Sequence, residues 1–501
     1  MKKTGSHTRY SQLLALAAMF GAVVSGCTVG PDFRTPAEPV AGSYTVTPLP
    51  RDATVSVGDG AGGQHLVTGQ ELSAQWWRLF HNSDLDRLIR QAVADSPTLA
   101  VAGATLRQAQ ENLRAQSGLV YFPAVDASLS GSRQKVSSAA SGQSGSSGFT
   151  YGLYNASLVV SYNLDLFGSG RRELEALRSQ VDFQRFQLEA AHLTLTSNIV
   201  TTVVKEASLR AQLEATREIL TVQEKLLGLV ERQFQLGGAA RSEVLTQQTQ
   251  LAQVRVTLPQ LEKELAQTRN QLAVYAGKFP SEASLPEFRL EGLSLPQELP
   301  LTLPSLLARQ RPDIRAAEEL LHAANAQIGV ATANLFPQIT LSGDIGAQAA
   351  TLGKLFSSGT PIWSLGAGLL QPVFRGGELT AKRRAAIAAH DQAVAQYREV
   401  VLQSFRNVAD VLQALDSDAA GLRAQAETER AARETLELTQ RQFEIGSTNY
   451  LLLLSAQRQH QQARIGLILA RAARLADSAA LFQALGGGWW NRESETGAVQ
   501  K

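Results

Sequence analysis

The feature that most constrains the fold is an internal duplication with a period of about 200 residues. Three landmarks occur twice and in the same order: Leu119–Pro123 and Ala333–Pro337, Phe167–Arg172 and Phe374–Glu378, and Arg232–Gly237 (RQFQLG) and Arg441–Gly446 (RQFEIG). A unit of this length is far longer than the repeats of a solenoid. Each copy must therefore contain several secondary-structure elements.

Each copy contains a long proline-free stretch rich in Leu, Ala, Glu, Gln and Arg, which are strong helix formers. These stretches predict long helices over 171–236 and 378–445, each about 100 Å long at 1.5 Å per residue. A rod of that length cannot pack inside one compact domain. After each long helix we expect a glycine turn and a shorter return helix: Gly237 with 241–276, and Gly446 with 450–485. Pro259 is expected to kink the first return helix.

Proline placement separates the two copies, because six prolines lie between Pro280 and Pro312. The chain is accordingly divided into a signal peptide, 1–26; an N-terminal segment, 27–83; a first repeat, 84–279; a connector, 280–312; a second repeat, 313–486; and a C-terminal tail, 487–501.

Two segments in each copy, within about 124–166 and 338–373, alternate apolar with polar residues before the long helix begins. In the first segment Val125, Ala127 and Leu129 alternate with polar side chains. Apolar-out, polar-in strands of about ten residues are typical of transmembrane β-barrels. A half-buried hairpin of a soluble protein has the same pattern and is the alternative.

Four strands per chain cannot close a barrel, and open sheet edges are not tolerated in lipid. Several chains must therefore share one barrel. Two chains would give eight strands and an interior filled by side chains, whereas three chains give twelve strands and a water-filled lumen. We therefore predict an α+β membrane protein: a trimer with a twelve-stranded barrel that continues into a long periplasmic α-helical barrel.

The N-terminus has the features of a secretory signal. Lys2, Lys3 and Arg9 precede an apolar stretch that is too short to remain as a spanning helix. The stretch ends in Ser25-Gly26-Cys27, which resembles the bacterial lipobox and implies S-diacylglycerol and an N-acyl group on Cys27. Thr28 rather than aspartate follows, which by the same resemblance indicates the outer membrane. An ordinary signal with a chance cysteine is the alternative.

Composition excludes several other classes of protein. Lys plus Arg number 47 against 45 for Asp plus Glu, so the chain lacks the charge excess of a polybasic nucleic-acid binder. One cysteine and seven scattered histidines offer no metal-ligand spacing. No catalytic Ser-His-Asp or Cys-His arrangement has a supporting context. We expect no enzyme, no metal, no nucleic acid and no cofactor beyond the covalent lipid.

The strand–helix junctions carry glycine and proline in both copies: Pro123, Gly168, Gly170, Pro337, Gly376 and Gly377. Gly168-Ser169-Gly170 is not a phosphate-binding loop, because no lysine or parallel-sheet context follows it. These residues are predicted to be conformational joints.

Trp76–Phe80 (WWRLF) with Asp84-Leu85, the duplicated strand–helix unit and the paired RQF-x-x-G turns resemble the outer-membrane efflux proteins. The similarity to this TolC-like family runs from the lipobox to about Gly488, and the lipoprotein branch of the NodT and OprM type, which serves resistance–nodulation–division (RND) pumps, is the best match. The resemblance implies an equatorial girdle formed by about 30–75, 280–312 and the C-terminal tail. It also implies a homotrimer, a periplasmic membrane-fusion adaptor, an inner-membrane RND transporter and outer-membrane lipid as partners.

The same resemblance places the periplasmic gate just after the two glycine turns. Glu243 falls where the first repeat carries an acid, with Arg241 as its candidate neighbour for ion pairing. Tyr450, Leu451 and Leu452 fall at or beside the constricting positions of the second repeat, and Ser455 replaces the usual aspartate. The alternatives without the resemblance are a solvated helix-terminus charge for Glu243 and a coiled-coil core residue for Leu451.

The function expected from these features is passive conduction of drugs or other small toxic compounds from the periplasm to the exterior, with an iris-like gate. The alternatives are a duct for type I (ABC-driven) protein secretion, a duct for metal-ion efflux, and a periplasmic lipoprotein that uses its helices as spacers.

Overall fold

The computed structural model describes residues 28–37, 39, 43–45, 64–136 and 149–492. The longer helices are α2 (Ser83–Asp95), α3 (Pro97–Tyr121), α4 (Ser169–Gln235), α5 (Arg241–Tyr275), α6 (Pro304–Gln310), α7 (Pro312–Ala333), α8 (Glu378–Glu444) and α9 (Tyr450–Ala484). The strands are β1 (His65–Thr68), β2 (Ala124–Val136), β3 (Phe149–Leu164), β4 (Glu298–Leu301), β5 (Gln338–Ala349) and β6 (Pro361–Leu370). The postulated lipid site, Cys27, lies outside the described residues.

The chain divides into two units that each combine segments from both copies. Unit 1 contains residues up to 36, 105–184 and 316–397, and unit 2 contains 37–104, 185–315 and 398 onward.

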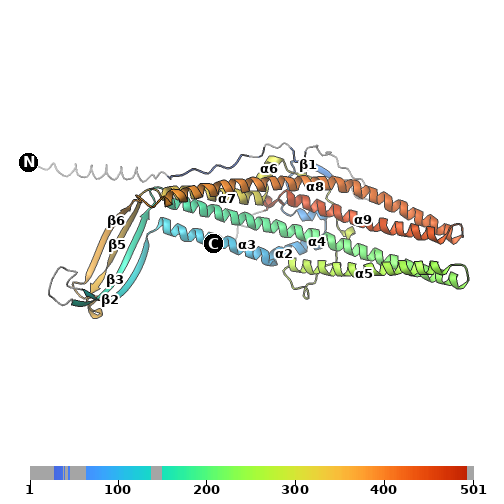
Figure 1. The fold of residues 1–501 in the computed structure, drawn as a ribbon, viewed down its shortest axis with the longest axis horizontal. Helices are drawn as coiled ribbons and strands as arrows, with labels where there is room; N and C mark the ends of the chain where they lie inside the picture. The colour runs from blue at the N-terminus through green and yellow to red at the C-terminus, as the bar shows by residue number, and fades with distance from the viewer. Residues whose placement is uncertain (1–27, 38, 40–42, 46–63, 137–148, 493–501) are drawn as a thin grey trace, which may run out of the picture. The chain divides into compact units, whose positions relative to one another are not determined.

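Unit 1 contains a four-stranded antiparallel sheet in the order β2-β3-β5-β6, as Figure 1 shows. The register places polar side chains of neighbouring strands opposite one another: Ser128 pairs with Ser157, Ser161 with Ser342, and Asn163 with Thr340. Two of these pairs are hydrogen-bonded, Ser128 to Ser157 at 2.9 Å and Thr340 to Asn163 at 2.7 Å. One face of the sheet is therefore polar across β2, β3 and β5, as the alternation predicted, whereas β6 contributes mainly glycine and apolar residues to this face. Among the described strands, β2 and β6 each have one unpaired edge.

Residues 28–33, which we call the N-terminal strap, lie along α4 and α7 in unit 1. The backbone N–H of Val29 donates to the carbonyl of Phe167 at 3.2 Å, and Asn325 donates to the carbonyl of Pro31 at 3.0 Å. The buried Arg172 pairs with Asp32 at 2.6 Å. Gly30 has φ +101°, and a Cβ there would meet the Cα of Gly329 at 2.5 Å, so only glycine permits this approach.

Unit 2 is built around a large apolar core. Trp76 is 1% exposed and stacks on Phe482 at 5.3 Å between ring centroids, while Phe80 and Leu85 are fully buried beside it. The core also includes buried residues of α4, α8 and α9 and of the connector. Near this core β1 and β4 form a small parallel pair. The WWRLF segment thus supplies the centre of the core.

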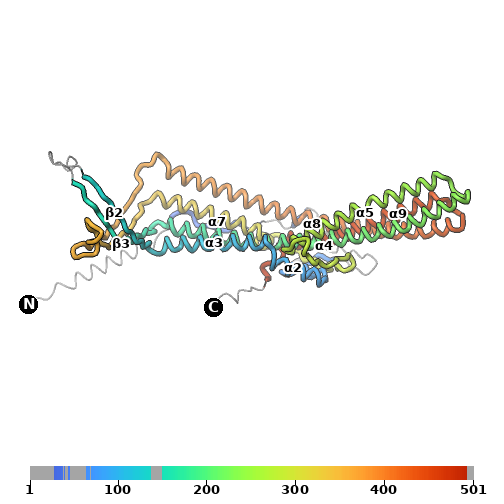
Figure 2. Tube along the Cα trace, turned by 90° about the horizontal axis from the view of Figure 1, so that it is seen from below, coloured from blue at the N-terminus to red at the C-terminus, as the bar shows by residue number. Residues whose placement is uncertain are grey.

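At one end of unit 2 the helices meet in two turns, one between α4 and α5 and one between α8 and α9. Figures 1 and 2 both show these turns at the same end of the unit. The two copies have equal lengths here, because α4 and α8 each contain 67 residues and α5 and α9 each contain 35. Helix α5 continues through Pro259, which is exposed, so water can reach the carbonyl that the proline leaves without a partner.

Within the described ranges, no helix combines the length and the apolarity needed to cross a lipid bilayer.

Candidate gate at the helix turns

The two turns have the same backbone geometry, which explains the repeated RQF-x-x-G signature. Gly237 has φ +78° and Gly446 has φ +72°. The N–H of Gly238 donates to the carbonyl of Gln233 at 2.8 Å, and the N–H of Ser447 donates to that of Gln442, also at 2.8 Å. This six-to-one hydrogen bond after a left-handed glycine is the Schellman motif that ends many helices.

In the helices next to the turns, three polar side chains form a buried hydrogen-bonded chain that we call the tip latch. It consists of Tyr450 at the start of α9, Gln247 in α5 and Gln223 in α4. The hydroxyl of Tyr450 donates to Oε1 of Gln247, and Nε2 of Gln247 donates to the carbonyl of Gln223 at 3.2 Å and to its Oε1. Gln247 is 0% exposed and Gln223 is 2% exposed. The tip latch therefore joins the second repeat to the first by neutral hydrogen bonds.

The tip latch lies beside a small apolar cluster. Val230, Tyr450 and Leu454 are buried against one another, with Val244 and Phe443 packed at the edge. Burial, with a smaller contribution from the Glu243 carboxylate, raises the pKa of Tyr450 to about 12. The phenol consequently stays protonated and able to donate at any physiological pH.

The structure separates the predicted gate residues into two groups. Tyr450 is 7% exposed, whereas Leu451 is 63% and Leu452 is 52% exposed. Residues 450, 453, 454 and 457 are all buried and share one stripe of α9, so Tyr450 faces the packed side of the helix. The predicted role of Tyr450 in constricting a passage stays a prediction. Leu451 is exposed within the single chain, and both interpretations of it stay predictions.

The charged residues of the tip lie near its surface. Glu243 is half-buried in the first turn of α5, where the helix dipole favours an acid. Arg241 is exposed, and among the described residues no carboxylate lies within 4.0 Å of it, so the expected ion pair is not formed. Ser455 is partly exposed on the same side of α9 as Leu451.

The junction glycines have different local roles. Gly168 has φ +81°, and a Cβ there would meet the Cγ2 of Thr28 at 2.8 Å. Gly170 is helical and lies against Val120. Gly376 and Gly377 have φ +58° and +85° with open space around them. Pro123 directly precedes β2, and Pro337 directly precedes β5. Their predicted role as joints stays a prediction.

Sequence reasoning missed Gln223, Gln247 and the Asn449 cap. Asn449 accepts a hydrogen bond from the N–H of Leu452 at 2.9 Å, which fixes the start of α9. Asparagine before a helical segment is a recognisable signal. A glutamine in an amphipathic helix carries no such signal. Among the described residues, no group of three or more His, Cys, Asp or Glu side chains is arranged to hold a metal ion.

The duplicated strand–helix unit, the sheet with one polar face and the paired helix turns define a channel-type membrane protein. A sequence profile described as outer membrane efflux protein matches residues 88–278 and 303–487. The chain belongs to the outer membrane efflux protein family, whose members are channel proteins of the bacterial outer membrane rather than enzymes.

Individual relatives match along nearly the whole chain. The toluene efflux pump outer membrane protein TtgC of Pseudomonas putida is 32% identical over 487 residues, covering 96% of this chain and 97% of its own. The pyoverdine export outer membrane protein OpmQ of Pseudomonas aeruginosa is 31% identical, covering 89% of this chain and 94% of its own. The solved structure of the outer-membrane channel OprN has a TM-score of 0.82 at 28% identity, covering 92% of this chain and 100% of that one.

Proposed function

We propose that this protein is the exit duct of a tripartite RND-type efflux pump. It conducts small toxic compounds passively from the periplasm to the exterior, and the pump supplies the energy. The observation that carries the proposal is the sheet of unit 1, which has a polar face across β2, β3 and β5 and two strand edges that remain unpaired among the described strands.

Trimerisation closes the sheet. The edges of β2 and β6 expose backbone donors and acceptors that lipid cannot satisfy. Three chains join these edges into a twelve-stranded barrel in which the polar face lines the lumen and the apolar face meets lipid. The helices continue the same symmetry as a periplasmic tube. The lipid on Cys27 anchors each chain to the membrane.

The gate is formed by the helix turns. Opening is an iris-like shear of α5 and α9 against α4 and α8, which must break the tip latch of Tyr450, Gln247 and Gln223. Glu243 gives the entrance a negative charge, and Leu451 and Leu452 are apolar side chains available to narrow it. A periplasmic adaptor docks at these turns and stabilises the open arrangement.

The inner-membrane pump selects the cargo. The names of two relatives refer to toluene and to pyoverdine, which are chemically unlike, although both chains resemble this one to a similar degree. A duct lined by generic polar residues accommodates both. This supports a role in drug and solvent export without a narrow selectivity filter.

In-cell cross-linking and affinity purification of the tagged full-length chain, read by mass spectrometry, test the proposal. Recovery of a trimer together with an RND transporter and its adaptor is the expected result. Recovery of an ABC exporter would indicate type I secretion instead of drug efflux, and recovery of a metal-specific transporter would indicate metal efflux. A monomer without inner-membrane partners would overturn the shared-barrel argument.

A further inference from the structure

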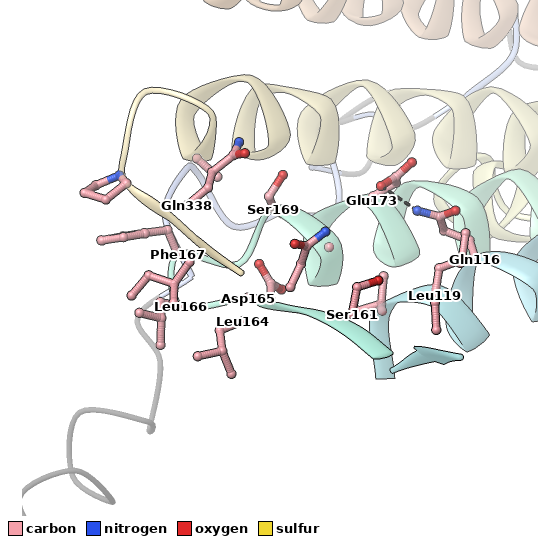
Figure 3. Close-up of a pocket in the computed structure, with 17 residues that line it drawn as sticks. Gln116, Leu119, Ser161, Leu164, Asp165, Leu166, Phe167, Ser169, Glu173 and Gln338 are labelled. Carbon is pink, nitrogen blue, oxygen red and sulfur yellow. Dashed lines mark hydrogen bonds between the residues drawn. The ribbon is translucent and has the colours of Figure 1, made fainter. Parts of the chain in front are cut away.

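A cavity of about 410 Å³ lies in unit 1, where the sheet meets α3, α4 and α7. Figure 3 shows Glu173 and Gln116 at one end of it, Phe167 and Gln338 at the other, and Asp165 between them. The volume is within the range of about 300–1,000 Å³ typical of small-molecule sites. The gate does not use this cavity.

The two carboxylates of the cavity differ in how they are neutralised. Oδ2 of Asp165 accepts the backbone N–H of Arg171 at 2.8 Å and faces the Arg171 guanidinium at 3.4 Å, so this charge is compensated within the helix start. Glu173 accepts only the side-chain amide of Gln116, at 2.8 Å. Within the described chain no Lys, Arg or His nitrogen lies within 4.0 Å of Glu173. One negative charge therefore remains without a cationic partner.

The rest of the lining is divided between apolar and polar groups. Leu119, Val120 and Phe167 supply apolar surface, and Ser161, Asn163, Ser169 and Gln338 supply hydrogen-bonding groups. A Cβ at Gly170 would approach Val120 at 3.0 Å and Asp165 at 3.4 Å, so the glycine keeps this space open. Such a lining fits a ligand with an apolar body and one polar or charged end.

The cavity lies on the polar side of the sheet. Ser161, Asn163 and Gln338 belong to the polar face defined by the strand register. On α4, the residues that hold the N-terminal strap, Arg172 and its partner Glu175, project from a different side of the helix than Glu173. If the polar face lines the duct, as the proposed function requires, the cavity opens into the lumen.

We propose that this cavity is a binding site for amphipathic organic cations of single charge, with Glu173 as the anionic partner. Binding exchanges the amide of Gln116 for the cation at the Glu173 carboxylate, and the apolar body of the ligand lies against Leu119, Val120 and Phe167. The inference rests on the proposed function only for its statement that the site faces the lumen. It assigns the duct a binding site for cationic cargo that is separate from the periplasmic gate.

Equilibrium dialysis of the purified full-length protein in detergent tests the site. The probes are tetraphenylphosphonium and tetraphenylborate, which have nearly the same shape and opposite charge. We expect saturable binding of about one tetraphenylphosphonium per chain and no comparable binding of tetraphenylborate. Glu173→Gln should weaken cation binding about tenfold, because it removes the negative charge that attracts the phosphonium ion. Empty micelles supply the background for both ions.

Two further variants separate the site from general effects of charge or folding. Glu111→Gln makes the same chemical change at an exposed position of α3 and should leave binding unchanged. Gln116→Ala removes the competing amide and should tighten cation binding, a change that loss of folding cannot produce.

Equal binding to the wild-type and Glu173→Gln proteins, or equal binding of both ions, would overturn the proposal. The dialysis requires no pump, so it tests the binding site independently of the proposed export function. A wild-type chain that binds the cation but does not restore export in cells would contradict the proposed function alone.

Discussion

Replacing Tyr450 with phenylalanine removes one hydrogen-bond donor from the tip latch and leaves the aromatic ring in place. Gln247 is 0% exposed, and its Oε1 accepts a hydrogen bond from the Tyr450 hydroxyl. Without that hydroxyl, the amide oxygen stays buried and loses this donor. The aromatic contact of residue 450 with Phe443, at 6.4 Å between ring centroids, is retained.

The magnitude follows from the burial of Gln247. A buried acceptor that loses its partner destabilises the closed state by about 1–3 kcal/mol. When the tip opens, water replaces the missing donor, so the open state is affected little. The equilibrium between closed and open tips should therefore shift toward the open form by roughly 5- to 150-fold. The pKa of Tyr450 is raised to about 12, so this ratio should not vary between pH 6 and pH 9.

Single-channel recording in planar bilayers measures the shift as an increase in open probability or leak conductance over the wild-type protein. In cells, the same variant should increase sensitivity to large antibiotics that enter through an open duct. Tyr121→Phe, at a half-exposed tyrosine of α3, is the matched control and should behave as wild type. Equal conductance of Tyr450→Phe and wild-type channels would refute the idea that the tip latch holds the gate closed.

Three other changes test separate parts of the molecule. Glu243→Gln should reduce cation preference, so the reversal potential under a salt gradient should move toward zero; an unchanged value would exclude a role for this carboxylate in selectivity. Cys27→Ser should abolish incorporation of radiolabelled palmitate, and persistent labelling would place the lipid elsewhere. Burial, assisted by Arg492, lowers the pKa of His192 to about 4, so the unfolded chain takes up a proton first as the pH falls below 6.5. Stability should drop by on the order of 2–3 kcal/mol at pH 4.5 relative to pH 7, and His192→Gln should remove this loss in thermal unfolding monitored by circular dichroism.

The sequence predicted the helix turns and the two-faced strands, because short stretches of neighbouring residues determine both. The glycine of each RQF-x-x-G signature adopts the left-handed conformation that the turn needs, and the alternation around Val125 corresponds to one polar and one apolar face. The sequence alone does not predict that α5 continues through Pro259, because this depends on the packing of Leu251 and Val254 before the proline and of Leu272 after it. Proline on an exposed side of a packed helix is tolerated where the freed carbonyl is hydrated.

At the candidate gate, the sequence alone could not predict which side chains pack inward. A count from the turn placed Tyr450 and Leu451 together, yet neighbouring residues on a helix point about 100° apart. The buried stripe of 450, 453, 454 and 457 decides which one packs inward. The hydrogen-bond partner of Tyr450, Gln247, lies 203 residues away along the chain, so no spacing rule within either segment connects the two residues.

The N-terminal strap gives the order of synthesis a structural meaning. Pro31 emerges early, but its partner Asn325 follows 294 residues later, after the whole first copy. A chain cut short before α7 would still contain residues 28–33, with no α7 to receive them. Docking of the strap against α7 is therefore possible only in a chain that contains both copies. A protease that recognises an undocked N-terminal segment would distinguish unfinished channels from finished ones before they assemble.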